Sequence, residues 1–178
     1  PGYYSDLSNY KRVLRQRHVY LKESAIDTSI LDIWDHELAR YGAKVISRRD
    51  EFILKINDIS KEIHGSISGG KETLNVKYEA NVEKSADPAD TESVFYEKLL
   101  KTRDDDIRNR TTGIGPHKDD LKISADGVDL RKFGSQGQQR TTALSLKLSE
   151  IELVRQVIRD TPILLLDDVL SELDKNRQ

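Results

Sequence analysis

The sequence predicts an α+β protein in which helices dominate. Apolar residues recur every three or four positions over long stretches, which is the pattern of amphipathic helices, and they alternate with polar residues in only one short stretch. Only three Phe and one Trp occur among the 178 residues, which favours aliphatic helix packing. This length suits one domain of ordinary size or two small lobes.

Composition narrows the classes of function. The net charge is −2 and the pI is about 6.1, so a surface that binds nucleic acid would have to be a local patch. The absence of cysteine excludes disulfides, thiolate metal sites and cysteine catalysis, and fits a reducing cytosol. No apolar run approaches the roughly 20 residues that cross a bilayer. Because the chain starts with Pro1 and contains no Met, we expect an internal piece of a longer protein.

The first helix is predicted at residues 7–22. Its apolar face is formed by residues at helical spacing, namely Leu7, Tyr10, Leu14 and Leu21. A stripe of basic residues lies beside this face and comprises Lys11, Arg15, His18 and Lys22. The stripe fits either a contact with DNA phosphates or an ordinary solvated helix face.

Residues 28–64 predict one long helix, because spacings of three, four and seven persist throughout. Such a helix would reach about 55 Å. Gly42 weakens its middle without forbidding continuation. We expect this helix to pair with the first one in antiparallel fashion, as an arm-like element that ends at "GSISGGKE", residues 65–72.

A strand and a third helix follow. Residues 73–80 alternate in polarity, as in a half-buried strand. Asp90 is expected to cap a helix that continues past residue 100. At its end, two acids each precede an arginine by four residues, so we expect ion pairs along the helix, Asp104 with Arg108 and Asp106 with Arg110.

The chain becomes glycine-rich after residue 111. Residues 121–130 predict a hairpin with Asp126-Gly127 at its turn. His117, Asp119 and Asp120 fit turn hydrogen bonds, with a metal cluster as the alternative. No chemical role follows for the Gly115-Pro116-His117 loop. The other histidines are interpreted as surface or packing residues. A long helix is then predicted at 141–159, with an apolar face of Ala143, Leu144, Leu148, Ile151, Val154 and Ile158.

Two motifs near the end of the chain carry the chemistry. In "GSQGQQR", Ser135 offers a hydroxyl and Gly137 permits close approach at a helix N-terminus, which fits a phosphate contact or a simple helix cap. "ILLLDD", residues 163–168, predicts a strand buried on both faces. Asp167 would hold Mg²⁺, and Asp168 would orient or deprotonate an attacking water. An ordinary strand exit is the alternative for the two acids.

The order of these motifs resembles that of ATP-binding-cassette ATPases. "SQGQQ" is similar to their signature motif, "ILLLDD" to the Walker B strand and "SELD", residues 171–174, to the D-loop. Asp168 stands where many such ATPases have glutamate. Its side chain is shorter by one methylene, so the resemblance implies slow hydrolysis.

The wider sequence resembles the RecF family of bacterial recombination and gap-repair ATPases, distant relatives of the SMC proteins. The segments that carry the resemblance are "YKRVLRQRHVYLK", "TGIGPHKDDL", "FGSQGQQRTTALSLKLSEIEL" and "PILLLDDVLSELD". It covers nearly the whole chain, is dense from 112 to 174 and is weaker from 44 to 90. Gln136 stands where the general cassette signature has Gly, and the RecF pattern accommodates Gln there, which favours RecF over SMC.

The resemblance implies a composite site between two heads. The signature residues would contact the γ-phosphate of an ATP held by a second subunit, and these residues are Ser135, Gln136, Gly137 and Gln138. Asp167 would serve the Mg²⁺ of this subunit's own nucleotide, with Asp168 as its catalytic carboxylate. Ser171 and Asp174 would communicate across the ATP-bound homodimer.

The resemblance also implies an organisation and a cellular setting. Residues 1–110 would form a helical arm lobe, 111–160 the glycine loops, hairpin and signature helix, and 161–178 a stub of the ATPase core with Walker B and D-loop. The expected partners are gapped or junction DNA and recombination mediator proteins, in the bacterial cytoplasm at the nucleoid and within the SOS response, without a membrane. A full-length member would be a weak, DNA-stimulated ATPase.

One motif of such an ATPase is missing. G-x-x-x-x-G-K-[ST] occurs nowhere, since the similar stretch from Gly65 has Glu72 in the last position and lacks a strand before it. The resemblance places the Walker A loop upstream of Pro1 and the switch histidine beyond Gln178, so we expect the isolated chain not to hydrolyse ATP. The alternatives are a non-catalytic protein-interaction module and another SMC-like ATPase head.

Overall fold

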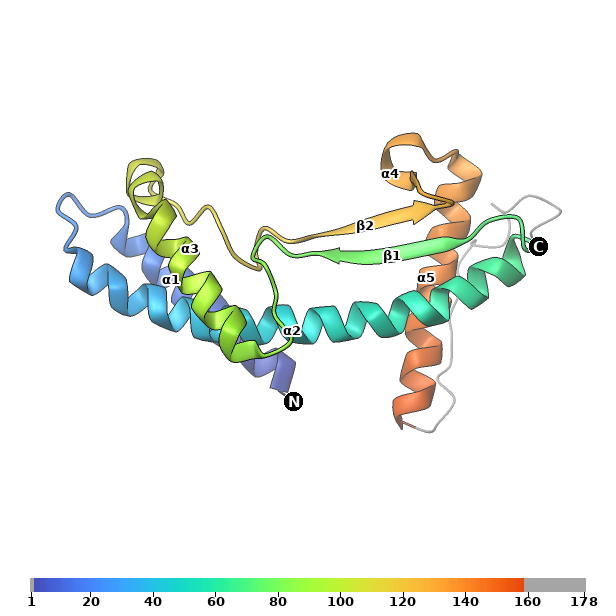
Figure 1. Ribbon diagram of the computed structural model, residues 1–178, viewed down its shortest axis with the longest axis horizontal. Coiled ribbons are helices and arrows are strands. Elements are labelled where there is room, and N and C mark those ends of the chain that lie inside the picture. Colours follow the sequence, from blue (N-terminus) through green and yellow to red (C-terminus); the bar gives the residue numbers. More distant parts are fainter. Residues whose placement is uncertain (1, 159–178) are drawn as a thin grey trace. The chain divides into compact units, whose positions relative to one another are not determined.

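The computed structural model describes residues 2–158 (Figure 1). The elements in chain order are α1 (Gly2–Tyr20), α2 (Thr28–Ile67), β1 (Leu74–Glu79), α3 (Pro88–Asn109), β2 (Asp120–Ala125), β3 (Val128–Asp129), α4 (Leu130–Phe133) and α5 (Gln136–Ile158). The predicted helix-dominated α+β class is confirmed. No helix within the described residues is long and apolar enough to cross a membrane. The predicted strand at 163–168 lies outside them.

The chain folds as two units. The helical unit consists of Pro1–Asp50 and Glu79–Asp120, and the mixed unit consists of Glu51–Tyr78 and the residues from Leu121 onward. Helix α2 contributes its first part to the helical unit and its last part to the mixed unit. Each unit therefore combines segments that are far apart in the sequence.

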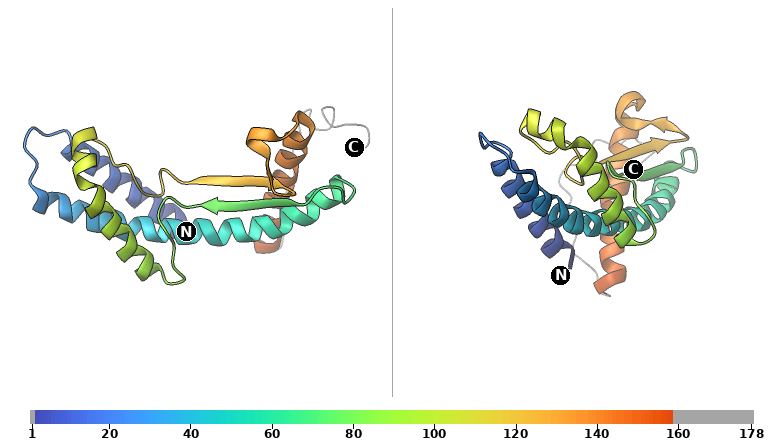
Figure 2. Two further views of the ribbon diagram at one scale, coloured as in Figure 1. Left: turned by 45° about the horizontal axis from the view of Figure 1, so that its top comes forward. Right: turned by 60° about the vertical axis from the view of Figure 1, so that its left-hand side comes forward.

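In the helical unit, α1 and the first part of α2 lie side by side and run in opposite directions, as the sequence predicts (Figures 1 and 2). The residues of α1 with the most deeply buried side chains are Tyr10, Val13 and Arg17, and Leu21 just after the helix is buried as well. Leu7 and Leu14, which were expected on this face, are only half-buried. The face is therefore turned slightly from the predicted one, and a charged residue lies at its centre.

Arg17 is that charged residue, and its side chain is fully buried. Its Nε donates to Asp35 Oδ1 at 2.7 Å, and its Nη1 donates to Asp106 Oδ2 at 2.8 Å and to Thr112 Oγ1 at 2.7 Å. Arg103 donates to the other oxygen of Asp35 at 2.7 Å. These bonds join α1, α2 and α3, and a buried charge is tolerated only because it is paired in this way.

The acidic cluster does form an ion pair along α3, but the predicted pairing of Asp104 with Arg108 and of Asp106 with Arg110 is wrong. Asp106 is 3% exposed and faces Arg17 rather than Arg110, because it lies on the side of α3 that packs in the unit. Arg108 pairs instead with Asp105, at 3.4 Å on the exposed side of the helix. Residue spacing alone does not distinguish the buried face of a helix from its exposed one.

The predicted cap of α3 is also wrong. Asp87, not Asp90, is the N-cap, and its Oδ1 accepts a hydrogen bond from Ala89 N at 2.8 Å. Pro88 occupies the first helical position, where its fixed φ suits the helix and its missing N–H is not needed. The helix therefore begins before Asp90, which lies in its first turn.

The mixed unit contains a three-stranded sheet in the order β1-β2-β3. The arrows of β1 and β2 point in opposite directions (Figure 1). The predicted hairpin is confirmed, since Ala125 pairs with Val128 across a two-residue turn in which Asp126 and Gly127 have φ of 49° and 83°. A small apolar core lies beside the sheet and contains Leu74, Val76, Ala125 and Leu130, with Ile53, Ile123 and Leu146 packed against them.

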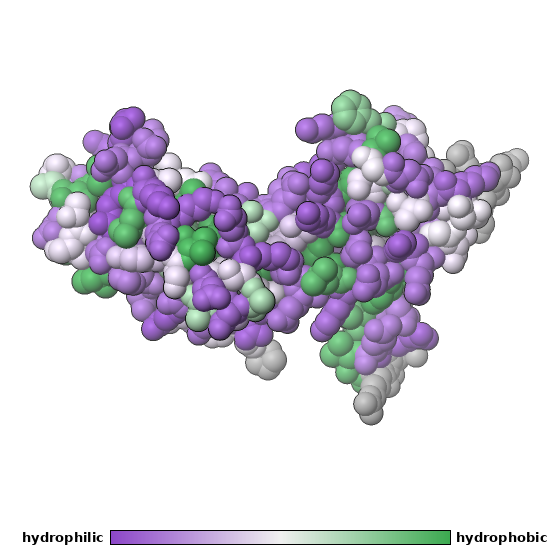
Figure 3. All heavy atoms as spheres, in the orientation of Figure 1, coloured by the Kyte–Doolittle hydropathy of each residue, from purple (hydrophilic) through white to green (hydrophobic). Residues whose placement is uncertain are grey.

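Helix α5 buries a different face from the predicted one. Its buried residues are mainly small and polar, namely Thr141, Thr142, Leu144, Ser145 and Ser149. The Ser149 hydroxyl donates to the Ser145 carbonyl one turn earlier, and the Ser145 hydroxyl lies 2.8 Å from the Thr141 carbonyl and 3.1 Å from His64 Nδ1, so both polar groups have partners. Val154 and Ile158, which were expected to be buried, are 44% and 56% exposed. Figure 3 shows the apolar surface that results along the lower part of α5.

Two glycines of α2 allow a matched test of packing. A Cβ on Gly42 would lie 2.4 Å from Phe95 Cε1, whereas a Cβ on Gly65 would meet nothing within 4 Å. Alanine favours the helix by roughly 0.8–1 kcal/mol over glycine, so Gly65→Ala should raise the free energy of unfolding by up to about that amount. Gly42→Ala should lower it by about 1–3 kcal/mol, because the core is overfilled. Urea denaturation followed by circular dichroism measures both, and a stabilising Gly42→Ala would contradict the packing.

Candidate functional site

The predicted phosphate-contacting loop begins α5. Ser135 precedes the helix, and its Oγ accepts a hydrogen bond from Gln138 N at 3.2 Å. In return, Gln138 Oε1 accepts one from Ser135 N at 2.9 Å. This reciprocal pair is a capping box with glutamine in the third helical position. The predicted helix cap at Ser135 is therefore confirmed.

The cap is compatible with an anion contact at the same residue. The bond to Gln138 uses a lone pair of Ser135 Oγ and not its hydroxyl proton, which can still be donated to an anionic oxygen. Ser135 and Gln136 are exposed, and α5 is 23 residues long, so the positive end of its dipole is directed at this surface. Gly137, in the first turn of α5, has no Cβ to stand between the backbone and an approaching group.

The turn before the cap is held from two sides. Gln139 Nε2 donates to the carbonyls of Leu130 and Gly134, at 3.0 and 3.3 Å. A Cβ on Gly134 would lie 2.5 Å from the Leu130 carbonyl oxygen, so the backbone of α4 allows only glycine there. The position of Ser135 is therefore fixed by backbone contacts of α4 as well as by the capping box.

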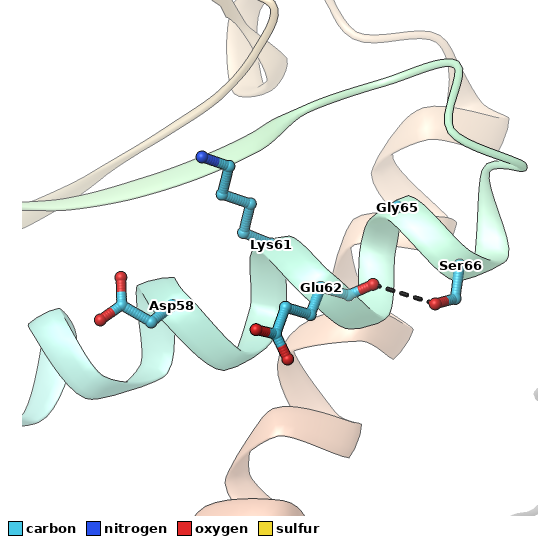
Figure 4. Close-up of a pocket in the computed structure, with 5 residues that line it drawn as sticks. All are labelled: Asp58, Lys61, Glu62, Gly65 and Ser66. Atoms are coloured by element: carbon cyan, nitrogen blue, oxygen red, sulfur yellow. Dashed lines mark hydrogen bonds between the residues drawn. The ribbon is translucent and has the colours of Figure 1, made fainter.

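The glycines at 65–70 end a helix and do not form a phosphate loop. Gly65 and Ser66 lie in the last turns of α2, where Ser66 Oγ donates to the Glu62 carbonyl at 3.1 Å (Figure 4). Gly69 and Gly70 follow with φ of 63° and 73°, and Gly70 N donates to the Gly65 carbonyl at 2.8 Å. A helix that ends with residues in the left-handed conformation requires glycine at those positions. The rejection of this stretch as a Walker A loop is confirmed.

Glu72 and His64 are functional candidates that the sequence did not reveal. His64, interpreted as a surface or packing residue, is fully buried, and its Nε2 lies 3.2 Å from Glu72 Oε2. Glu72 Oε1 in turn accepts a hydrogen bond from Gln138 Nε2 at 3.3 Å. Eight positions separate His64 from Glu72, and the left-handed turn that joins them leaves no regular spacing in the sequence.

The Gly115-Pro116-His117 loop, for which no role could be predicted, packs against α1 and α2 in the helical unit. Gly115 has φ of 122°, and a Cβ there would lie 2.6 Å from Tyr10 Oη. His117 Nε2 lies 3.0 Å from the Thr112 carbonyl, so it carries the proton, and Nδ1 accepts from Tyr10 Oη at 2.6 Å. The Pro116 carbonyl accepts a hydrogen bond from Arg49.

The alternative of a metal cluster at His117, Asp119 and Asp120 finds no support in the geometry. Both ring nitrogens of His117 are bound to protein groups, and Asp119 Oδ1 accepts a hydrogen bond from Asn81 N at 2.7 Å. The other Asp119 oxygen lies 3.5 Å from Arg49 Nη1. Within residues 2–158, no three His, Asp or Glu side chains are placed to hold a metal ion.

The basic stripe of α1 is partly available to a ligand. Lys11, Arg15 and Lys22 are exposed, and none has an acidic partner within 4 Å among the described residues. His18 differs from them, because its Nε2 accepts a hydrogen bond from Thr112 N at 3.0 Å. Arg12, which the sequence analysis did not include, is also exposed in this part of α1.

The remaining predicted site residues lie outside the described part of the chain. They are Asp167, Asp168, Ser171 and Asp174. Of the predicted nucleotide-binding residues, the structure therefore describes the signature set, Ser135 to Gln138, whose first and last members are hydrogen-bonded to each other.

Comparison with known proteins identifies the class of protein to which this fold belongs. No protein-family model matches the chain. Two solved structures, of the recombination mediator protein RecF-ATP and RecF-ATPrS in the RecFOR pathway, each match 98% of the chain with a TM-score of 0.90 and 36% identity. The fold is thus that of about half of the recombination mediator protein RecF, since the chain covers 48% of each of those proteins.

Curated relatives give the particular family. The chain is 51% identical over 180 residues to the DNA replication and repair protein RecF of Agathobacter rectalis, and 45% identical to those of Clostridioides difficile and Streptococcus suis. These matches cover 99–100% of the chain and 47–49% of the relatives. The chain belongs to the RecF family and spans about half the length of the relatives that it matches.

The histidines around Thr112 should make stability depend on pH. Burial is the main cause that lowers the pKa of both His18 and His117 below 6.5. The unfolded chain therefore takes up protons first as the pH falls, and the free energy of unfolding should decrease from about pH 7.5 to about pH 5.5. This decrease should be smaller in His18→Gln than in the wild type, because one of the two histidines with a lowered pKa is then absent. Equal pH dependence in wild type and His18→Gln would contradict the assignment.

Proposed function

We propose that the chain supplies the signature side of an ATP site shared by two subunits of a RecF-type protein in DNA replication, recombination and repair. The capping box of Ser135 and Gln138 carries the proposal, because it presents a hydroxyl proton and a helix N-terminus at an exposed surface. The sequence contains no phosphate loop of its own, so the nucleotide that Ser135 contacts is held by residues outside these 178. The ATP in the RecF-ATP structure supports nucleotide as the ligand.

The residues after position 158 complete the proposed chemistry. Asp167 holds Mg²⁺ on the subunit's own nucleotide, since a hard cation takes carboxylate, water and phosphate oxygens. Asp168 orients or deprotonates the attacking water. Ser171 and Asp174 connect the two sites of the ATP-bound homodimer. The ATPase is weak, because the shorter Asp168 must reach the water that glutamate otherwise contacts.

DNA is the proposed macromolecular partner, at gaps and single-strand to double-strand junctions of the bacterial nucleoid. The exposed cations Lys11, Arg15 and Lys22 on one side of α1 support this contact, because phosphate recognition begins with unpaired positive charge. His18 contributes to it by holding the end of α1 against Thr112. Recombination mediator proteins of the same pathway are the proposed protein partners.

Ser135→Arg in the full-length protein tests the shared site. The larger side chain fills the space in front of α5, so ATP-dependent dimerisation should be lost while each subunit still binds ATP. Sedimentation with and without ATP measures the dimer, and a fluorescent ATP analogue measures binding. Ser93→Arg, at another exposed serine, is the control and should dimerise normally. Normal ATP-dependent dimerisation of Ser135→Arg would refute the shared site.

A further inference from the structure

Glu72 lies at the centre of a chain of hydrogen bonds that reaches the signature loop. Its Oε1 accepts from Gln138 Nε2 at 3.3 Å, and its Oε2 lies 3.2 Å from His64 Nε2. The other nitrogen of His64, Nδ1, lies 3.1 Å from Ser145 Oγ. This series of hydrogen bonds begins and ends on α5, since Gln138 and Ser145 both belong to that helix. Between them it passes through the end of α2.

The carboxylate fixes the orientation of the Gln138 amide. A carboxylate only accepts hydrogen bonds, so both His64 Nε2 and Gln138 Nε2 donate to Glu72. With its nitrogen directed at Glu72, Gln138 directs its oxygen at Ser135 N, which it meets at 2.9 Å. The reversed amide would place an oxygen against the carboxylate and an NH₂ group against the Ser135 N–H. Glu72 thereby selects the amide orientation on which the capping box depends.

The surroundings make this contact stronger than an ordinary surface bond. The His64 side chain is fully buried, and that of Glu72 is 14% exposed. Hydrogen bonds to a charged group are strengthened where water is largely excluded. Gln138 and Ser145 are seven residues apart, two helical turns, so His64 and Glu72 contact one face of α5. The first two turns of α5 are thus tied to the end of α2.

We propose that Glu72, supported by His64, is a positioning residue for the signature loop. It holds the Gln138 amide so that Ser135 keeps its N–H satisfied and its hydroxyl directed outward for the γ-phosphate of the partner's ATP. Glu72 does not touch the nucleotide and acts through Gln138. This inference rests on the proposed function, because only a working signature loop makes its positioning measurable.

The test compares ATP-dependent dimerisation of full-length variants. Glu72→Ala should raise the protein concentration for half-dimerisation about tenfold, and Glu72→Gln, which keeps a hydrogen-bond acceptor, should raise it by less. ATP binding by the single subunit should stay unchanged. Glu62→Gln is the matched control, since Glu62 is exposed near the end of α2 and its carboxylate makes no hydrogen bond within the described residues.

A double-variant cycle separates positioning from general stabilisation. If Glu72 acts through Gln138, Glu72→Ala should add nothing to the effect of Gln138→Ala, whereas independent contributions would add. Additive effects, or normal dimerisation of both Glu72 variants, would overturn the inference. Should Glu72→Ala fail to fold, Glu72→Gln carries the same cycle. Loss of dimerisation in Ser135→Arg with none in the Glu72 variants would refute the positioning role alone, whereas normal Ser135→Arg would refute the proposed function.

Discussion

The reciprocal hydrogen bonds between Ser135 and Gln138 are the interaction on which the candidate site depends. They start α5 at Gln136 and satisfy a backbone N–H at each end of the first turn, while the Ser135 hydroxyl proton stays available to a ligand. One serine can therefore cap the helix and contact a phosphate, and the two interpretations of the sequence are not alternatives. Two further contacts hold this turn. Gln139 donates to the Leu130 carbonyl, which precedes the turn, and Glu72 accepts from Gln138 within it.

The helical unit is organised around a different buried residue. Thr112 accepts a bond from Arg17 at its hydroxyl, donates its N–H to His18 and binds His117 through its carbonyl. Every polar group of this residue is thus used, and the same contacts hold the glycine-rich loop against α1. These contacts fix the packed side of α1 and do not involve its exposed cations.

Periodicity was sufficient to predict the four long helices and strand β1, because burial imposes a regular spacing on local elements. The Asp126-Gly127 pair predicted the hairpin, and the short helix α4 was not predicted. It was insufficient where the decisive partner is distant in sequence. Asp106 pairs with Arg17, 89 positions away, and this contact overrides the expected pairing along α3. Glu72 was noticed only as the residue that spoils a phosphate loop, whereas its partner in the signature motif lies 66 positions away. The helix cap at Ser135 could be predicted from local sequence, whereas its assignment to a signature motif rests on the resemblance to ATP-binding-cassette ATPases and stays a prediction.

Mixing two full-length variants tests most directly whether the site is shared between subunits. Ser135→Ala and Asp168→Asn should each hydrolyse ATP slowly, because each alters one half of every site. In a shared site, their mixed dimer keeps one complete site, so an equal mixture should recover about a quarter of the wild-type rate, half of its dimers being mixed. If signature and Walker B of one subunit served the same nucleotide, the mixture would stay at the mean of the two variant rates, and the account would be wrong.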